Sequence, residues 1–143
     1  MVPVLLICTL GLAVSPSSAQ RQRAIHAIAN RAIHRGAFSQ AALLYDHVLL
    51  DAIDPGPRSF LLKALLMERM GHWDKARSTF REGNRRYKAD GKLLQAWGLM
   101  ESRTGSGALA LRLLRRCVAC DSSLAPVLRW RRFASAEAAV VGF

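Results

Sequence analysis

Acidic side chains are scarce in this chain: of 143 residues, 10 are Asp or Glu, against 21 that are Lys or Arg. The carboxylates are dispersed, and no two stand at a spacing that suggests a general acid–base pair. The glycine-rich stretch at Gly105 and Gly107 lacks both the preceding strand and the lysine of a phosphate-binding loop. These absences lead us to expect a protein that is not an enzyme and has neither a small-molecule substrate nor a cofactor.

Candidate metal ligands are also few, since the chain contains 3 Cys and 4 His. Cys117 and Cys120 form one Cys-x-x-Cys pair, but no second Cys or His pair stands where it would complete a zinc site. His26 and His34 lie eight residues apart on one expected helix, too far to share an ion. We therefore predict no metal site and interpret Cys117 as a packing residue, although in a secreted protein the cysteine pair could oxidise.

No window of the sequence alternates apolar and polar residues cleanly enough to indicate a β-strand. Apolar residues recur instead at the i, i+3, i+4 and i+7 spacing of amphipathic helices. Pro55, Pro57 and Pro126 fall between the expected helical hairpins, where helix propagation should stop. The sequence predicts an all-α fold.

What the chain does contain is a phrase repeated three times, in which an alanine follows a glycine by five residues. The glycines are 35 and 34 residues apart. The three pairs are Gly36 with Ala41, Gly71 with Ala76, and Gly105 with Ala110. A period of this length is typical of stacked helical hairpins. We expect each glycine to take a positive φ in the turn between two helices, and each alanine to let those helices approach closely.

Frames that begin 14 residues before each glycine divide the chain into repeats at residues 22–56, 57–90 and 91–124. Across the frames the eighth residue is small, the twentieth is alanine and the twenty-fourth is bulky. The eighth residues are Ala29, Ala64 and Gly98, and the twenty-fourth are Tyr45, Phe80 and Leu114. Residues 125–143 are expected to be a partial fourth repeat or a C-terminal cap. The chain could also be a fragment of a longer repeat protein.

This pattern resembles the tetratricopeptide repeat (TPR). The stretches that end in Leu-Met-Glu68 and Leu-Met-Glu101, together with Trp97 and the Ala76-Arg77 pair, are similar to the half-a-TPR (HAT) subclass of RNA-processing factors. The stretches 93–101 and 113–116 are similar to HAT proteins that mature chloroplast messenger RNAs. The resemblance covers residues 22–132, and it is weaker in the first repeat, where Ile33 replaces the glutamate. It implies a right-handed superhelical solenoid of about three helix-turn-helix repeats.

The formal net charge of +11 favours an anionic partner. In the TPR resemblance, positions 2 and 13 of each first helix face a groove, and all six are cationic or potentially cationic. These residues are Arg23, Arg58 and Lys92 at position 2, and His34, Arg69 and Arg103 at position 13. Regular cations of this kind would meet successive phosphates of single-stranded RNA.

Other groove positions offer little for reading bases. Asn30 and Gln95 could hydrogen-bond a base and His26 could stack on one, but no Phe, Tyr or Trp occupies these positions. We therefore expect RNA binding without sequence-specific recognition. The alternative is a scaffold whose groove binds protein partners and makes no direct RNA contact.

A second set of basic residues follows helical spacing on the second helices of the hairpins. It comprises Arg77, Arg81, Arg85 and Lys88, and is continued one repeat later by Arg112, Arg115 and Arg116. This outer basic stripe is interpreted either as a solvated face or as a further binding surface.

The N-terminus has the features of a targeting segment. Residues 1–20 carry no charged side chain, and the apolar run ends in small residues at Ala19, where a signal peptidase would cut. The run is shorter than the roughly 20 residues that span a membrane, so we predict that residues 1–19 are cleaved, with a buried helix as the alternative. Residues 20–45 contain four arginines and no acid, as organellar transit peptides do. The two parts together resemble the bipartite leaders of secondary-plastid algae, which implies a plastid location. Secretion is the alternative.

Overall fold

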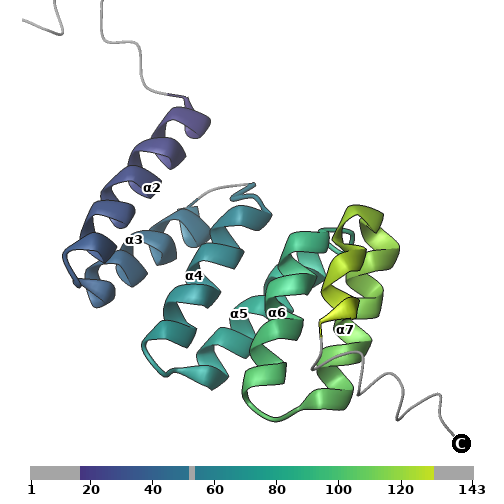
Figure 1. Ribbon diagram of the computed structural model, residues 1–143. Coiled ribbons are helices and arrows are strands. Elements are labelled where there is room, and N and C mark those ends of the chain that lie inside the picture. The colour runs from purple at the N-terminus through teal and green to yellow at the C-terminus, as the bar shows by residue number, and fades with distance from the viewer. Residues whose placement is uncertain (1–16, 52–53, 131–143) are drawn as a thin grey trace, which may run out of the picture.

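The computed structural model describes residues 17–51 and 54–130, and within these ranges every regular element is helical. The all-α prediction is confirmed for this part of the chain. The elements are α2 (Ser18–His34), α3 (Phe38–Asp51), α4 (Pro57–Arg69), α5 (Trp73–Arg86), α6 (Gly91–Arg103), α7 (Gly107–Cys120) and the 3₁₀ helix η1 (Ser122–Arg129). They form three hairpins that follow one another in space as they do in the chain: α2 with α3, α4 with α5, and α6 with α7 (Figure 1).

The glycines of the repeated phrase lie in the turns inside the hairpins. Gly36, Gly71 and Gly105 have φ values of 77°, 78° and 92°, and no other residue type has a positive φ in the described ranges. The residue after each glycine donates its N–H to a carbonyl five residues back, which closes the end of the first helix. These bonds are Ala37 to Ala32 at 2.8 Å, His72 to Met67 at 2.9 Å, and Ser106 to Glu101 at 2.9 Å.

Small residues allow the helices of each hairpin to pack closely. Ala41, Ala76 and Ala110 are completely buried. At Gly98, a methyl group in place of the hydrogen would lie 2.9 Å from Cγ of Leu114, which is closer than such atoms pack. Bulky side chains at the twenty-fourth position fill the remaining space, since Tyr45, Phe80 and Leu114 are 2%, 0% and 0% exposed.

The junction between the first two hairpins fixes the start of α4 beside α2. Gln22 of α2 donates from Nε2 to the carbonyl of Asp54 at 3.0 Å. Gly56, with a φ of 77°, donates its N–H to the Tyr87 hydroxyl at 3.0 Å, and that hydroxyl in turn donates to the Asp54 carboxylate. These contacts set Arg58, the second residue of α4, next to α2.

The first described helix begins before the first repeat frame. Helix α2 begins at Ser18, and Ser17 and Gln20 cap it reciprocally: Gln20 N–H donates to Ser17 Oγ at 3.2 Å, and Ser17 N–H to Gln20 Oε1 at 2.7 Å. Ser18 and Ala19, the last residues of the predicted targeting segment, therefore belong to the first turn of α2. Residues 1–16 lie outside the described residues. No helix in the described ranges is long and apolar enough to cross a bilayer.

The element after α7 is the 3₁₀ helix η1. It begins at Ser122, where Asp121 accepts a hydrogen bond from Ser123 N–H at 3.0 Å. Val127 is 2% exposed and packs against Ala110 and Leu114, so η1 covers the end of α7. Residues 131–143, which make up most of the expected partial repeat or cap, lie outside the described residues.

Candidate nucleic-acid interface

The first helices of the hairpins, α2, α4 and α6, carry the predicted groove residues. Arg23, Arg58 and Lys92 lie near the N-terminal ends of these helices, and all three are exposed. None of them forms an ion pair with another described residue. Lys92 does act on Asp121 at a distance: the hydrogen bonds from Ser123 are the main cause of the lowered pKa of Asp121, and the charge of Lys92 lowers it further. The hairpin array therefore offers one accessible cation per hairpin along this edge.

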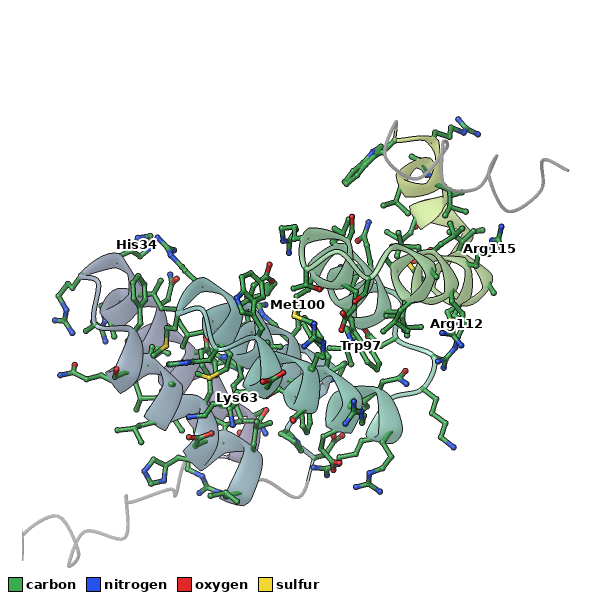
Figure 2. The ribbon with its side chains drawn as sticks, turned by 90° about the horizontal axis from the view of Figure 1, so that it is seen from below. His34, Lys63, Trp97, Met100, Arg112 and Arg115 are labelled. Atoms are coloured by element: carbon green, nitrogen blue, oxygen red, sulfur yellow. The ribbon has the colours of Figure 1, made fainter. Side chains whose placement is uncertain are left out.

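The residues at position 13 are exposed too, but two of them connect neighbouring hairpins. The Arg69 guanidinium lies over the Phe38 ring, 4.8 Å from its centroid. Arg103 donates from Nε to Glu68 Oε1 at 2.6 Å, from the third hairpin to the second. His34 lies at one end of the array and Arg112 and Arg115 at the other (Figure 2). The Glu68 carboxylate partly neutralises Arg103, so Arg103 has less charge to offer a ligand than Arg23 and Arg58, whereas Arg69 stacks on a neutral ring and keeps its charge.

A cavity of about 270 Å³ opens between α2 and α4, and we call it the His26 cavity. Its lining comprises His26, Ala27, Asn30, Ile33, Tyr45, Arg58 and Leu62. Three predicted groove residues thus meet at one place: His26, Asn30 and Arg58. Gln95, half-buried on α6, does not line this cavity.

Tyr45 is absent from the predicted site residues because its place in the repeat marks it as core. It is 2% exposed, as that place requires, yet its ring lies 5.4 Å from the His26 ring, centroid to centroid, at an angle of 49°. A core aromatic therefore also forms a wall of the cavity. The bulky twenty-fourth position is the available signal, but nothing in the sequence indicates that a cavity opens there.

The hydrogen bonds around His26 determine which of its two ring nitrogens carries the proton. The Ser59 hydroxyl donates to the Pro55 carbonyl at 2.8 Å, so its only hydrogen is engaged. His26 Nε2, 3.3 Å from Ser59 Oγ, must therefore be the protonated nitrogen that donates to Ser59. Nδ1 is left as an acceptor, and it is buried with no partner among the described residues. Burial lowers the pKa of His26, and the charge of Arg58 lowers it further, which keeps the ring neutral.

Arg77 of the predicted outer basic stripe is not a solvated residue, and this expectation is wrong. Its Nε donates to Glu101 Oε1 at 2.8 Å and its Nη2 to Oε2 at 3.2 Å, while Glu101 is 0% exposed. Trp97, near the centre of Figure 2, donates to the same carboxylate at 3.1 Å. Burial would raise the pKa of Glu101, but the hydrogen bonds from Arg77 and Trp97 hold it below its ordinary value. Helical spacing assigned Arg77 to the stripe, but spacing does not show what lies beside a residue in space. A buried carboxylate requires a cation beside it, and Arg77 is the cation that pairs with Glu101.

The other stripe residues are exposed, although they differ in charge balance. Arg85 pairs with Glu82 at 2.6 Å on the same helix, whereas Arg81 pairs with no described residue. Lys88, Arg112, Arg115 and Arg116 are also exposed. The accessible positive charge of the second helices therefore lies mainly at Arg81 and on α7.

A larger groove runs between α3 and α5, with residues of α4 also lining it. This α3–α5 groove has a volume of about 630 Å³ and is lined by Ser39, Ala42, Leu43, Asp46, Lys63, Met67, Met70, His72, Lys75, Ser78 and Thr79. A second cavity of about 320 Å³ shares Lys63, Ser78 and Thr79 with it and extends it toward Leu50. Leu43 and Leu50 are 63% and 82% exposed on this side. Lys63, labelled in Figure 2, pairs with Asp46.

No protein-family model, curated protein or solved structure matches this chain. Its chemistry must therefore be inferred from its own residues. Across residues 17–51 and 54–130, no three His, Cys, Asp or Glu side chains are grouped to hold a metal ion. Cys117 is buried, and burial raises the pKa of its thiol to about 11, so it is protonated at neutral pH. Cys120 is exposed and free.

Proposed function

We propose that this protein is a non-enzymatic HAT/TPR-like repeat module, built as a right-handed superhelical solenoid, that binds single-stranded RNA. One observation carries the proposal. Arg23, Arg58 and Lys92 are exposed and free of ion pairs within the described residues, one on each hairpin, and a cavity with polar groups lies beside Arg58. Cations that need not break a partner before binding give the largest electrostatic gain with a phosphate backbone.

Regular spacing suits a repeating polyanion better than a compact ligand, because each hairpin offers its cation at the equivalent place. Binding of this kind is governed by phosphate contacts and is tolerant of sequence. A strand held along the repeats is occluded from nucleases. We therefore assign the module to RNA processing or messenger RNA stabilisation, in a plastid if residues 1–19 and the basic segment after them act as a leader. Secretion is the competing location.

The test is a salt titration of RNA affinity with the full chain and an unstructured single-stranded oligonucleotide. Arg58→Glu combined with Lys92→Glu should weaken binding and should make the logarithmic salt slope shallower by about 0.7 for each phosphate that is no longer neutralised. The matched control is Arg81→Glu combined with Arg116→Glu, which changes the net charge equally at two exposed residues of the second helices. Equal weakening in both double variants would show that only net charge matters, and unchanged affinity in the first would refute the assignment.

A second candidate function is a protein-interaction scaffold, which the α3–α5 groove favours. Leu43 is exposed beside buried Met67 in this groove, and Leu50 is exposed in the cavity that extends it, so the two leucines offer an apolar surface that suits an amphipathic segment of a partner protein. If this function holds instead, Leu43→Glu should abolish a specific protein complex that Arg58→Glu leaves intact. RNA binding by the purified protein would then be absent in both variants.

A further inference from the structure

Trp130 carries an aromatic ring at the surface where the array of hairpins ends. Its side chain is 50% exposed. It ends η1, and its N–H donates to the Val127 carbonyl at 3.3 Å, which holds the backbone that carries the ring. Tryptophan is among the most buried residue types on average, and when it is left at a surface it is typical of contacts with a ligand. The indole of Trp130 is therefore a candidate contact for a flat, apolar group.

The helix η1 borders the face of α6 that carries Lys92. A methyl group added at Gly91, the residue before Lys92, would lie 2.9 Å from Cβ of Asp121, so η1 begins in contact with the start of α6. Leu99 follows Lys92 by seven residues on the same face of α6, and it packs against the buried cluster that contains Val127 of η1. Figure 2 shows η1 projecting beyond α7 at the end of the array. A strand bound at Lys92 therefore meets η1 next.

The chain around Trp130 is positively charged. Arg129 is exposed beside it. Arginines also occupy positions 131 and 132, which lie outside the described residues, and the sequence between Asp121 and Glu137 contains no carboxylate. An exposed aromatic ring among cations is the combination that binds single-stranded nucleic acid, because the cations attract phosphates while the ring stacks on a base.

We propose that Trp130 is a stacking platform for one base of the RNA strand, and that Arg129 contacts a phosphate beside that base. This inference rests on the proposed function, because the strand reaches η1 by following the cations of the first helices to Lys92. A 3₁₀ helix rises about 2 Å per residue, so the ring lies about 16 Å along η1 from Ser122, the length of about five stacked nucleotides. Every base has a face that can stack, so this contact does not depend on sequence.

The other two tryptophans provide the controls. Trp73 is 39% exposed at the start of α5, but the next residue is Asp74, whose carboxylate is exposed and accepts a hydrogen bond from Arg77 at 3.1 Å. A carboxylate beside the ring repels phosphates, so Trp73 should not contact the strand. Trp97 is 8% exposed and donates to the buried Glu101, so it is closed to a ligand.

The first measurement is tryptophan fluorescence of the full chain, since a base stacked on an indole quenches its emission. The titrants are an oligouridylate and a strand of equal length made abasic throughout. The intact strand, and not the abasic one, should quench the wild type and Trp73→Phe, whereas Trp130→Phe should show no quenching. Quenching that persists in Trp130→Phe, or equal quenching of the wild type by both strands, would overturn the platform.

The second measurement is the affinity of the same variants for the two strands. Trp130→Ala should weaken binding of the intact strand about tenfold, the equivalent of about 1.4 kcal/mol, and should leave the affinity for the abasic strand unchanged. Trp130→Phe should keep most of the affinity because phenylalanine also stacks, and Trp73→Ala should change neither value. Circular dichroism checks that each variant is folded. An equal loss for both strands in Trp130→Ala would mean that the ring contacts no base, which refutes the inference.

The outcomes separate this inference from the proposed function. Salt-dependent binding that is equally tight for intact and abasic strands, and is unchanged in Trp130→Ala, leaves the function standing and refutes the platform. Failure to bind either strand refutes the function and the platform together. Emission from Trp130 that changes with protein concentration but not with RNA would make a second copy of the chain the occupant, which also refutes the platform.

Discussion

Replacing Arg77 by alanine should destabilise the protein strongly, because it would leave a buried carboxylate without its cation. Glu101 is 0% exposed, and Arg77 makes two of its hydrogen bonds, at 2.8 and 3.2 Å. Trp97, at 3.1 Å, would remain as a donor, whereas the Thr104 hydroxyl divides its one hydrogen between this carboxylate, at 3.3 Å, and the Glu101 carbonyl, at 3.0 Å. The Arg77–Glu101 pair also joins α5 of the second hairpin to α6 of the third, so its removal weakens the packing between them.

The magnitude follows from burial. Removing one partner of a buried ion pair costs about 3–5 kcal/mol. The Arg77 side chain is itself 29% exposed, so water can partly replace it, and we expect a decrease of about 2–4 kcal/mol in unfolding free energy. A domain of this size has only about 5–15 kcal/mol in total. Replacing both partners, as in Arg77→Leu with Glu101→Leu, should cost less than the sum of the single changes, because no unpaired charge is left.

The assay is equilibrium urea unfolding followed by circular dichroism at neutral pH. Arg81→Ala is the matched control, since Arg81 is exposed one turn further along α5 and pairs with no described residue; it should change stability by less than about 0.5 kcal/mol. A destabilisation in Arg77→Ala no larger than that of the control would refute the reasoning about the buried pair.

Three further predictions concern stability. The pKa of Glu101 is held below its ordinary value of 4.5 in the folded protein. Its charged form therefore contributes fully to the unfolding free energy above about pH 4.5, and this contribution is lost as pH falls through the lower folded-state pKa. Glu101→Gln should flatten the acid side of the profile of stability against pH, and an unchanged profile would contradict this. Gly71→Ala should cost about 1–2 kcal/mol because the residue has a φ of 78°. Gly107→Ala, at the first residue of α7 with no atom close to the added methyl group, should be neutral or stabilise by up to about 1 kcal/mol in the same urea assay; similar effects at both sites would argue against the turn geometry. Ser17→Ala should cost about 1 kcal/mol by removing the cap on α2, seen as reduced helicity and a lower midpoint; cleavage after Ala19 removes the same cap and should have at least that effect.

Much of the fold could be predicted from the sequence because its main features are local. A glycine with positive φ, followed five residues later by a buried alanine, needs only the turn and the two helices that flank it. Gly71 and Ala76 illustrate this, with a φ of 78° and 0% exposure. The element after α7 is harder to predict, since whether Val127 lies on a new α-helix or on a 3₁₀ turn depends on how it packs against Ala110 and Leu114.

The candidate site shows the opposite balance. The resemblance to the TPR assigned Arg58 and Asn30 to the same groove, and their residue types made them candidates for an anionic ligand. The cavity beside them was not predictable, because it depends on the distance between α2 and α4 and on the position of Tyr45 from a third helix. The free acceptor on His26 likewise depends on Ser59, 33 residues away in the chain.

By itself, then, the sequence determined the helical hairpins, their turns and the abundance of positive charge, because backbone conformation and helical periodicity are decided within a few residues. Only the tertiary structure decided which of those charges are available. Arg77 and Arg81 stand one helical turn apart and are alike in sequence, yet one is bound to the buried Glu101, 24 residues away, and the other is exposed. A charge is neutralised by what lies next to it in space, and that neighbour comes from another helix.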